Sequence, residues 1–333
     1  MSAVNYAAAF SPKVAESFSK ESLTDSATGK DYSFSGAKTV RVFTVDTVPL
    51  NNYSRTGANR YGEPVELGDT VQELVMGDDK SFTMTIDKGN QADQMNIKGA
   101  ARALRRQTEQ VVVPYIDKYR FAKWAQGAGI IQGLDSAPAK DTIVELIFDA
   151  GAEMGEKALA KGVVGEIDGM TVKRVPDSYV PGDLYFMVKW KGSTADPVKL
   201  QDAKIHKDPP GLSGNLLEGR IYHDAFVLGA KADGIYVAAA ASAVTAAPTI
   251  TVSAGKATIA STTSGAVLRY TLDGTDPRYS TTAQVYTAPV EAASGTRVRA
   301  YAAASTGYPS AVTEKPRYCS TMAALTVFTP PAA

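Results

Sequence analysis

The chain has 333 residues, of which 44% are hydrophobic, so it is long enough for two domains with substantial cores. Lysine and arginine together number 35, as do aspartate and glutamate, and this balance argues against a nucleic-acid or membrane clamp along the whole chain. A single cysteine excludes an internal disulfide framework, and no apolar stretch approaches the length of a membrane span. Residues 1–18 lack a basic region followed by an apolar run, so we expect no secretory signal.

The first part of the chain predicts an arm followed by a β excursion. Residues 1–35 are polar and rich in serine, and we expect an arm with little core of its own. The excursion, 36–89, includes a stretch dense in Asn, Gly, Tyr and Arg at 49–68, which is typical of an exposed loop. Gly77-Asp78-Asp79 predicts a turn. Strands are predicted at 38–45, 71–76 and 81–86.

The last two strands of this excursion predict a long hairpin. Phe82, Met84 and Ile86 alternate with polar residues, which indicates a half-buried strand. Because a two-stranded hairpin is marginal alone in water, we expect the excursion to lie on a partner subunit. The residues expected to make this intersubunit contact are Tyr53, Arg55, Arg60 and Tyr61.

Residues 90–133 are dominated by one predicted helix, from Asn90 to Gly127. At 1.5 Å per residue such a helix would be about 50 Å long. Pro114 is expected to kink it near Gln110, because proline lacks a backbone donor. A helical hairpin or coiled coil is one interpretation; the absence of a second predicted helix of that length favours a spine crossing a broad subunit. The face predicted to be apolar carries Ile97, Ala101, Leu104, Thr108, Val111, Tyr115, Tyr119 and Ala122.

Residues 134–237 mix helix and strand. A helix is predicted at 141–160, with Asp141 as the N-cap and Glu145 in the first turn. Helix and strands are segregated rather than alternating, so the predicted fold class is α+β. The strands are predicted at 170–175, 185–190, 205–207 and 220–228.

The composition changes after an alanine-rich segment at 238–247, which is typical of a linker. From 248 to 318 the residues Thr, Ser, Ala, Val and Tyr dominate, and no helical pattern remains. Closely spaced strands separated by turn residues predict a small β-sandwich there, followed by a tail at 319–333. The strands are predicted at 249–253, 256–261, 268–272, 285–286 and 297–303.

Residues capable of chemistry are sparse. Of the two histidines, His206 and His223, neither lies in a nucleophile elbow or beside a cysteine at metal-ligand spacing. His223 precedes Asp224, and Ser178 or Ser213 could complete a triad, but a satisfied structural histidine is favoured. No glycine-rich loop matches a nucleotide-binding pattern. The sequence therefore predicts a protein that is not an enzyme, with no catalytic, cofactor-binding or metal site.

Two charged clusters have alternative interpretations. Asp78 and Asp79 are expected to cap the backbone of their own turn, with calcium binding as the less favoured alternative. Arg102, Arg105 and Arg106 could contact phosphate, but a solvated or ion-paired helix face is favoured.

Several short segments recur in the order and spacing of a known family. They are 36–40 (GAKTV), 79–82 (DKSF), 111–121 (VVVPYIDKYRF), 167–169 (IDG), 175–176 (VP), 208–211 (DPPG) and 218–226 (EGRIYHDAF). Together with the order of arm, excursion, long helix and mixed domain, they resemble the major capsid protein of tailed phages, which has the Hong Kong 97-like fold. The resemblance covers about residues 36–236.

The resemblance implies that 36–89 is the E-loop, that 90–133 belongs to the peripheral domain, and that 134–237 holds the axial domain and a return to the peripheral domain. It implies an icosahedral shell of hexamers and pentamers of this chain, assembled in the host cytoplasm and present in the virion. The implied partners are a scaffolding protein, a portal and packaged double-stranded DNA without sequence specificity; no cofactor is implied. Between 160 and 164 the chain is short, where such capsid chains usually carry an extra strand and helix.

Residues 270–277 (YTLDGTDP) resemble an immunoglobulin-like module found at the end of chitobiases and hexosaminidases, where it accompanies the catalytic domain. Asp273-Gly274 and Asp276-Pro277 predict turns. A small core is expected to contain Tyr270, Tyr286 and Tyr301. If exposed tyrosines instead bind host-surface glycans, the candidates are Tyr279 and Tyr308.

Two function classes follow. The first is a shell protein whose module, 248–318, projects outward from its linker and is dispensable for the shell. The second is a tail-tube or surface carbohydrate-binding protein, which the long helix disfavours because tail-tube subunits are mainly β. An encapsulin-like compartment shares the capsid fold, and the appended module disfavours it. The arm before Gly36 is short for a built-in scaffolding domain, so we expect a separate scaffolding protein.

Overall fold

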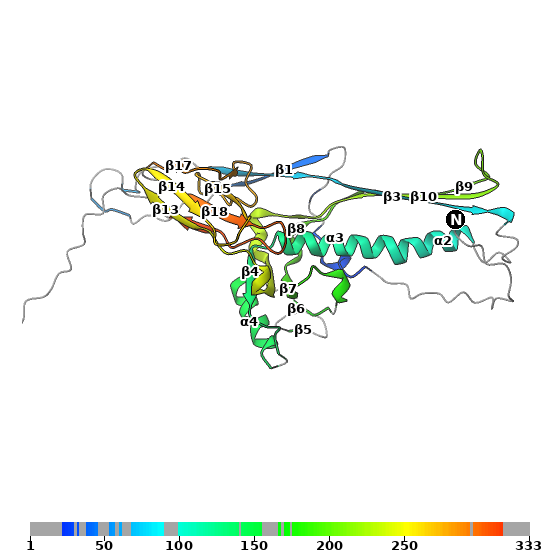
Figure 1. Cartoon of the computed structure of the whole chain (residues 1–333), viewed down its shortest axis with the longest axis horizontal. Coiled ribbons are helices and arrows are strands. Elements are labelled where there is room, and N and C mark those ends of the chain that lie inside the picture. The colour runs from blue at the N-terminus through cyan, green and yellow to red at the C-terminus, as the bar shows by residue number, and fades with distance from the viewer. Residues whose placement is uncertain are drawn as a thin grey trace, which may run out of the picture. The chain divides into compact units, whose positions relative to one another are not determined.

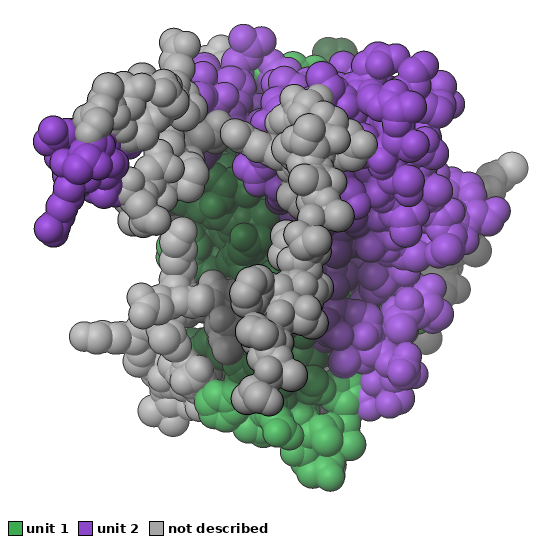
Figure 2. Space-filling view, turned by 90° about the vertical axis from the view of Figure 1, so that its left-hand side faces the viewer, with its two compact units in different colours: residues 1–40, 74–130, 138–237 green, residues 41–73, 131–137, 238–333 purple. Residues whose placement is uncertain are grey.

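The computed structural model describes residues 22–29, 32, 38–45, 53–56, 60–61, 68–89, 99–139, 141–154, 166–167, 170–173, 175–293 and 296–315. The chain divides into two compact units, which Figure 2 colours separately. Unit 1 comprises Met1–Val40, Leu74–Ile130 and Pro138–Val237, and unit 2 comprises Arg41–Glu73, Ile131–Ala137 and Ala238–Ala333. No helix among the described residues is long and apolar enough to cross a membrane.

The longest element of unit 1 is a helix of 27 residues, built from α2 (Ala100–Gln107), η2 (Thr108–Val112) and α3 (Val113–Gln126). The prediction of a long helix is confirmed, although residues 90–98 lie outside the described residues. Pro114 does not end it. The turn before the proline is π-helical, and the N–H of Val113 donates to the carbonyl of Thr108. This wider turn accommodates a ring that would otherwise clash with a carbonyl of the preceding turn.

The predicted apolar face of this helix is only partly confirmed: Tyr115, Tyr119 and Ala122 are half-buried, whereas Ala101 and Val111 are exposed. Val111 is exposed and its neighbour Val112 is buried. The π-helical turn holds one residue more than an α-turn, so it shifts the phase of every side chain after it. The buried residues of α3 are Asp117, Arg120, Phe121, Trp124 and Ala125.

Beside the helix lies an antiparallel sheet with the order β3 (Asp78–Asp87), β10 (Gly214–His223) and β9 (Val198–Lys207) (Figure 1). The predicted hairpin of 71–76 with 81–86 is therefore wrong: β2 (Asp69–Val75) pairs with β1 (Thr39–Val45) instead. Alternating burial in β3 shows which side chains face inward but not which strand is the partner. Asp78 and Asp79 are the first residues of β3, so the predicted turn ends at Gly77.

The remaining elements of unit 1 are short. The predicted helix at 141–160 is α4 (Ile143–Met154) with Glu145 in its first turn, and residues 155–165, including the short 160–164 stretch, lie outside the described residues. The 3-10 turns are η1 (Asp25–Ala27), η4 (Asp177–Tyr179), η5 (Lys191–Ser193) and η6 (Gly229–Gly234). The short strand pairs are β5 (Glu166–Ile167) with β6 (Met170–Thr171) and β8 (Thr194–Ala195) with β11 (Phe226–Val227).

The alanine-rich segment is not a linker. Its first residues belong to β12 (Ile235–Ala240), the middle strand of a sheet with the order β4 (Ile130–Leu134), β12 and β7 (Leu184–Lys189), and η7 (Ala241–Ala243) follows. Ala238 and Ala239 are fully buried. A strand buried on both faces is a continuous apolar run, and with small residues such a run resembles a flexible tether. The segment after β12 is also held, because the N–H of Thr245 and its hydroxyl both donate to the carbonyl of Tyr308.

Unit 2 ends in the predicted small β-sandwich, here called the module. One sheet has the order β13 (Thr249–Ser253), β14 (Lys256–Ala260), β17 (Val290–Glu291). The other has the order β16 (Gln284–Val285), β15 (Val267–Thr271), β18 (Val298–Ala303), β19 (Thr313–Lys315). All five predicted strands are confirmed. The core contains Ile250, Ile259, Tyr270 and Val298, with Tyr286 packed against it.

Candidate functional site

The described residues contain no cluster suited to metal binding. No group of three or more His, Cys, Asp or Glu side chains there could hold an ion. Asp79, considered for calcium, pairs with Arg220, which lowers the pKa of its carboxyl by a hydrogen bond. His206 lies 3.2 Å from Glu218 on the exposed part of the sheet.

Two tyrosines of α3 meet two buried carboxylates. The hydroxyl of Tyr115 donates to both carboxylate oxygens of Asp78 at 2.9 Å, and the hydroxyl of Tyr119 donates to Oδ1 of Asp224 at 2.8 Å. Asp224 also accepts from the N–H groups of Gly77 and Ala225, each at 2.8 Å. Burial and these hydrogen bonds raise the pKa of both phenols, so both remain donors. The contacts attach the helix to the start of β3 and the end of β10.

His223 is enclosed by this cluster and is 0% exposed. Its ring lies edge-on to those of Tyr115 and Tyr119, with centroids 5.9 and 5.1 Å away. Nε2 is 3.0 Å from Oδ2 of Asp78, yet neither ring nitrogen forms a well-directed hydrogen bond among the described residues. Burial lowers its pKa, so the ring is neutral. The histidine is structural, as predicted, but its nitrogens are not satisfied.

A triad around His223 is therefore excluded. Asp224 faces Tyr119 rather than the imidazole, and no hydroxyl bonds to the ring within the described part of the chain. Ser178 lies in η4, and Ser213 precedes β10. The arrangement can hold a helix on a sheet; it has no exposed nucleophile with a base.

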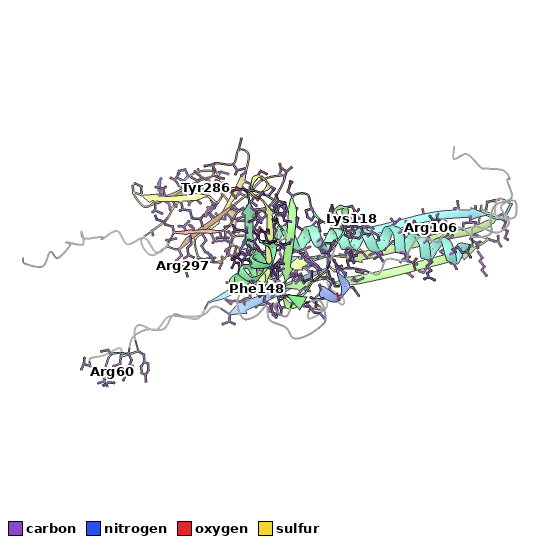
Figure 3. The ribbon with its side chains drawn as sticks, turned by 90° about the horizontal axis from the view of Figure 1, so that it is seen from below. Arg60, Arg106, Lys118, Phe148, Tyr286 and Arg297 are labelled. Carbon is purple, nitrogen blue, oxygen red and sulfur yellow. The ribbon has the colours of Figure 1, made fainter. Side chains whose placement is uncertain are left out.

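The basic residues of α2 are surface groups. Nε of Arg105 donates to Glu109 at 2.7 Å, and Nε of Arg106 donates to Gln110 at 3.0 Å, each four residues along the helix. Arg102 is exposed on the same helix. Figure 3 labels Arg106 on this helix. The favoured interpretation of a solvated, partly ion-paired face is confirmed.

Of the four predicted intersubunit residues, the structure brings Tyr53, Arg60 and Tyr61 together. The rings of Tyr53 and Tyr61 are edge-to-face with centroids 5.0 Å apart, and the N–H of Ser54 donates to the carbonyl of Arg60 at 2.9 Å. Tyr61 is 84% exposed, and Arg55 and Arg60 are exposed too. Figure 3 labels Arg60. The structure thus forms a compact aromatic and basic tip, and contact with another subunit stays a prediction.

The two candidate glycan residues differ. Tyr308 is only 2% exposed, so its ring cannot stack on a sugar, and this prediction is wrong. Its backbone N–H donates to the carbonyl of Ala243, and its carbonyl accepts from the N–H of Thr245. Tyr279 is half-buried, and its ring lies 5.2 Å from the guanidinium of Arg278, which pairs with Asp276.

The comparisons with known proteins bear on both units. Residues 257–316 match the family described as Fn3 associated, a range that includes the predicted 270–277 signature. A structure from Mycobacterium phage Che8 matches with a TM-score of 0.54 and 14% identity, over 70% of this chain and 96% of that chain. One from Microbacterium phage Oxtober96 matches with a TM-score of 0.51 and 13% identity, over 70% and 96% of the two chains. The chain has the fold of these two phage structures.

Other matches have lower scores. The structure described as "Capsid structure of the Cyanophage P-SCSP1u" has a TM-score of 0.49 and 14% identity, over 70% of this chain and 92% of that chain. No curated protein matches the sequence. At these identities the likeness concerns the fold, and the sequence signal that indicated the capsid fold was the order of short segments.

Two exposed apolar pairs on this capsid fold were not singled out from the sequence. Phe43 and Val45 are exposed on one face of β1, since residues two apart in a strand share a face. Val144 and Phe148 are exposed on α4, where residues four apart share a face, and Phe148 is labelled in Figure 3. Apolar spacing in the sequence predicts which residues share a face, but both core and interface give the same spacing.

Proposed function

We propose that the chain is the major capsid protein of a tailed bacteriophage, which self-assembles into an icosahedral shell around the genome. The observation that carries the proposal is the capsid fold, whose likeness covers 96% of the Che8 phage chain. A fold hosts more than one function, so the proposal also needs a surface suited to assembly. The alternative of a tail-tube subunit, which is mainly β, does not account for a helix of 27 residues.

The exposed side chains support self-association. Single exposed apolar residues are normal, but grouped ones mark interaction sites. Unit 2 carries the Phe43 and Val45 pair and the aromatic tip with Tyr61, and unit 1 carries Val144 and Phe148. A subunit that contacts several neighbours in a lattice needs more than one such surface, whereas a simple dimer needs one.

The role in the shell is structural rather than enzymatic. The buried Asp224 and His223 support the helix, and the described residues offer no metal cluster. We further propose that assembly uses a separate scaffolding protein and a portal, that hexamers and pentamers form in the host cytoplasm, and that the virion shell encloses double-stranded DNA without reading its sequence. The net charge of zero supports nonspecific enclosure rather than a tight DNA clamp.

Electron microscopy of the expressed chain tests the capsid assignment. Closed or partly closed shells are the expected product, and tubes of constant diameter or monomers alone would contradict the proposal. A variant with Tyr53, Arg55, Arg60 and Tyr61 all replaced by serine should stay folded, because these side chains are exposed, and should lose shells. The matched control replaces exposed Lys256 and Val267 of the module by serine, and its shells should be normal.

We propose that the module faces outward in the shell, because an interior filled with genome leaves little room for one extra domain per subunit. The segment that joins β12 to the module is not a flexible linker, because it is hydrogen-bonded to Tyr308. Within unit 2 the N–H of Thr281 also donates to the carbonyl of Val71 in β2, at 3.4 Å. A chain ending at Ala247 should therefore form shells without surface knobs but with lower yield, because β2 loses this contact. Unchanged knobs would contradict the outward position.

A further inference from the structure

The segment 22–29, here called the strap, is bound to α3 through one buried carboxylate. Asp117 is 1% exposed and accepts four hydrogen bonds from the strap. The donors are the Ser22 hydroxyl at 2.7 Å, the Leu23 N–H at 2.9 Å, the Thr24 N–H at 3.3 Å and the Thr24 hydroxyl at 2.5 Å. The sequence predicted an arm with little core of its own, and residues 22–29 pack on side chains of other elements, a contact that the sequence did not predict.

Cations hold the acceptors of the strap. Nη1 of Arg120, itself buried, donates to the Thr24 hydroxyl at 3.0 Å and to Asp25 at 3.4 Å. Nζ of Lys189 donates to the Ala27 carbonyl at 2.5 Å. Nζ of Lys173 donates to the Leu23 carbonyl at 3.1 Å and to the Ser26 hydroxyl. Donors and acceptors of the strap backbone are therefore both used, which is how proteins recognise peptides.

An apolar floor completes the site. Leu23 and Ala27 pack against a cluster formed by Phe121, Trp124 and Tyr179. At the far end of the strap, a Cβ on Gly29 would lie 1.8 Å from the carbonyl oxygen of Thr194, so no other residue fits. The site reads a Ser-Leu-Thr sequence at one end and a glycine at the other.

The site is incomplete without the strap. Asp117 would lose all the donors described above, and a buried carboxylate without donors is costly. Nε of Arg120 has no hydrogen-bond partner within the described residues, so the contacts to Thr24 and Asp25 are the ones that use its charge. Within the described part of the chain, the buried charged groups Asp117 and Arg120 therefore have their hydrogen-bond partners only when the strap occupies the site.

We propose that α3 carries a peptide-binding site centred on Asp117, that its ligand is the strap, and that this site holds residues 22–29 of the arm on α3 in the assembled shell. Asp117 is thus a positioning residue for the arm. The first two parts stand on the contacts alone, and the third rests on the proposed capsid function.

Cutting the folded full-length chain tests the binding site without any assembly. A protease recognition sequence inserted between Ser33 and Phe34 separates the strap from the rest after folding. In the wild-type sequence the fragment should co-elute with the body in gel filtration. The Asp117→Asn variant should release at least about tenfold more of the cleaved fragment than the wild type. The amide offers weaker or mismatched hydrogen bonds in place of those that the carboxylate accepts. Glu109→Gln, which also changes a carboxylate to an amide on this helix, should release no more of the fragment than the wild type.

A synthetic peptide of residues 20–32 should displace the bound fragment, and the released fragment is measured by gel filtration. The peptide with Thr24→Val keeps the shape but lacks the hydroxyl, and the peptide with Gly29→Ala carries the obstructing methyl. Both should compete at least about tenfold less well. Equal release from Asp117→Asn and the wild type, or equal competition by all three peptides, would overturn the site.

Assembly is scored separately on uncut chains. If Asp117→Asn releases the strap in the cutting test and its uncut shells are misshapen or absent, the positioning role is supported. Shells of normal size and yield from that variant would overturn the positioning role. If the wild-type chain gives no shells at all, the capsid proposal fails, while the cutting and peptide tests still decide whether the site exists.

Discussion

The helix of unit 1 and the module of unit 2 bury their side chains in different ways. The central strands of the module have one buried face: in β18 Val298, Ala300 and Ala302 are buried and alternate with half-buried neighbours. The helix α3 is covered on two opposite sides, by carboxylates that receive Tyr119 and by the strap that binds Asp117. One-sided apolar burial leaves a period in the sequence, whereas two-sided polar burial leaves none.

The largest expected effect comes from the apolar core of the module. Tyr270→Ala should destabilise the module by about 3–5 kcal/mol, the usual cost of truncating a buried aromatic ring. A domain this small buries little surface, so that loss should unfold it at room temperature. Hydrogen exchange of β15 and β18 amides measures the effect. Fluorescence of Trp124 and Trp190, both in unit 1, should not change, and a change there would contradict separate cores.

The module was predictable strand by strand because its pattern depends on one face only. In β14, Ala257 and Ile259 are buried and Lys256 and Thr258 are exposed, and the sequence shows that alternation directly. Tyr308 was misjudged because tyrosine occurs both in cores and on surfaces, and only the structure shows that it is buried.

The helix was predictable in extent but not in contacts. Nothing near Asp117 in the sequence indicates a contact with Thr24, 93 residues earlier. The sequence does not distinguish an aspartate that is buried in the fold from one that is exposed. The pairing of β3 with β10 is equally long-range. At Ala238 and Ala239 the sequence predicted an exposed linker where the structure has a buried strand. Small residues at the centre of a buried sheet have the same composition as a linker. The capsid fold was reached from the order of segments rather than from these contacts.

Polar burial in unit 1 predicts a pH dependence at alkaline pH. Burial lowers the pKa of Lys189 to about 8. The unfolded chain keeps its proton up to about pH 10.4, so above pH 8 the unfolded state binds more protons and the stability of unit 1 rises. From pH 8 to 9.5 the gain should be about 1.6 kcal/mol, because the folded lysine is already half deprotonated at pH 8. Urea unfolding followed by tryptophan fluorescence, compared with Lys189→Met, measures it. An equal rise in that variant would assign the gain to other groups.

The hydrogen bond from Tyr119 to Asp224 allows a comparison between a tyrosine that donates to a carboxylate and one that donates to a neutral amide. Tyr119→Phe removes one donor from a buried carboxylate that keeps the N–H groups of Gly77 and Ala225. We expect a loss of about 1.5 kcal/mol in unit 1, the lower end for a charged hydrogen bond. Tyr270→Phe, which loses a bond to neutral Gln284, is the matched variant in the module and should cost about 1 kcal/mol or less. The reverse order in denaturant unfolding would contradict a role for the carboxylate's charge.

The smallest effect, at acid pH, concerns His223. Burial is the largest influence on His223 and lowers its pKa. The nearby charges of Arg120 and Lys80 lower it too, while those of Asp78 and Asp224 raise it. The unfolded histidine titrates near pH 6.5, so below that pH the unfolded state binds more protons. Stability from neutral His223 is therefore full above pH 6.5 and is lost as the pH falls toward the lowered pKa.

This loss of stability in unit 1 should begin as the pH falls below about 6.5, where the unfolded histidine takes up a proton. Tryptophan-monitored unfolding of the wild type and His223→Gln measures it, and the glutamine variant should lack this part of the slope. A wild type that gains stability on acidification relative to His223→Gln would mean that Asp78 pairs with a charged ring at 3.0 Å. In that case the ionic contact with Asp78, rather than burial, would set the pKa of His223, and charged contacts would contribute more to the stability of unit 1 than they do in the apolar module.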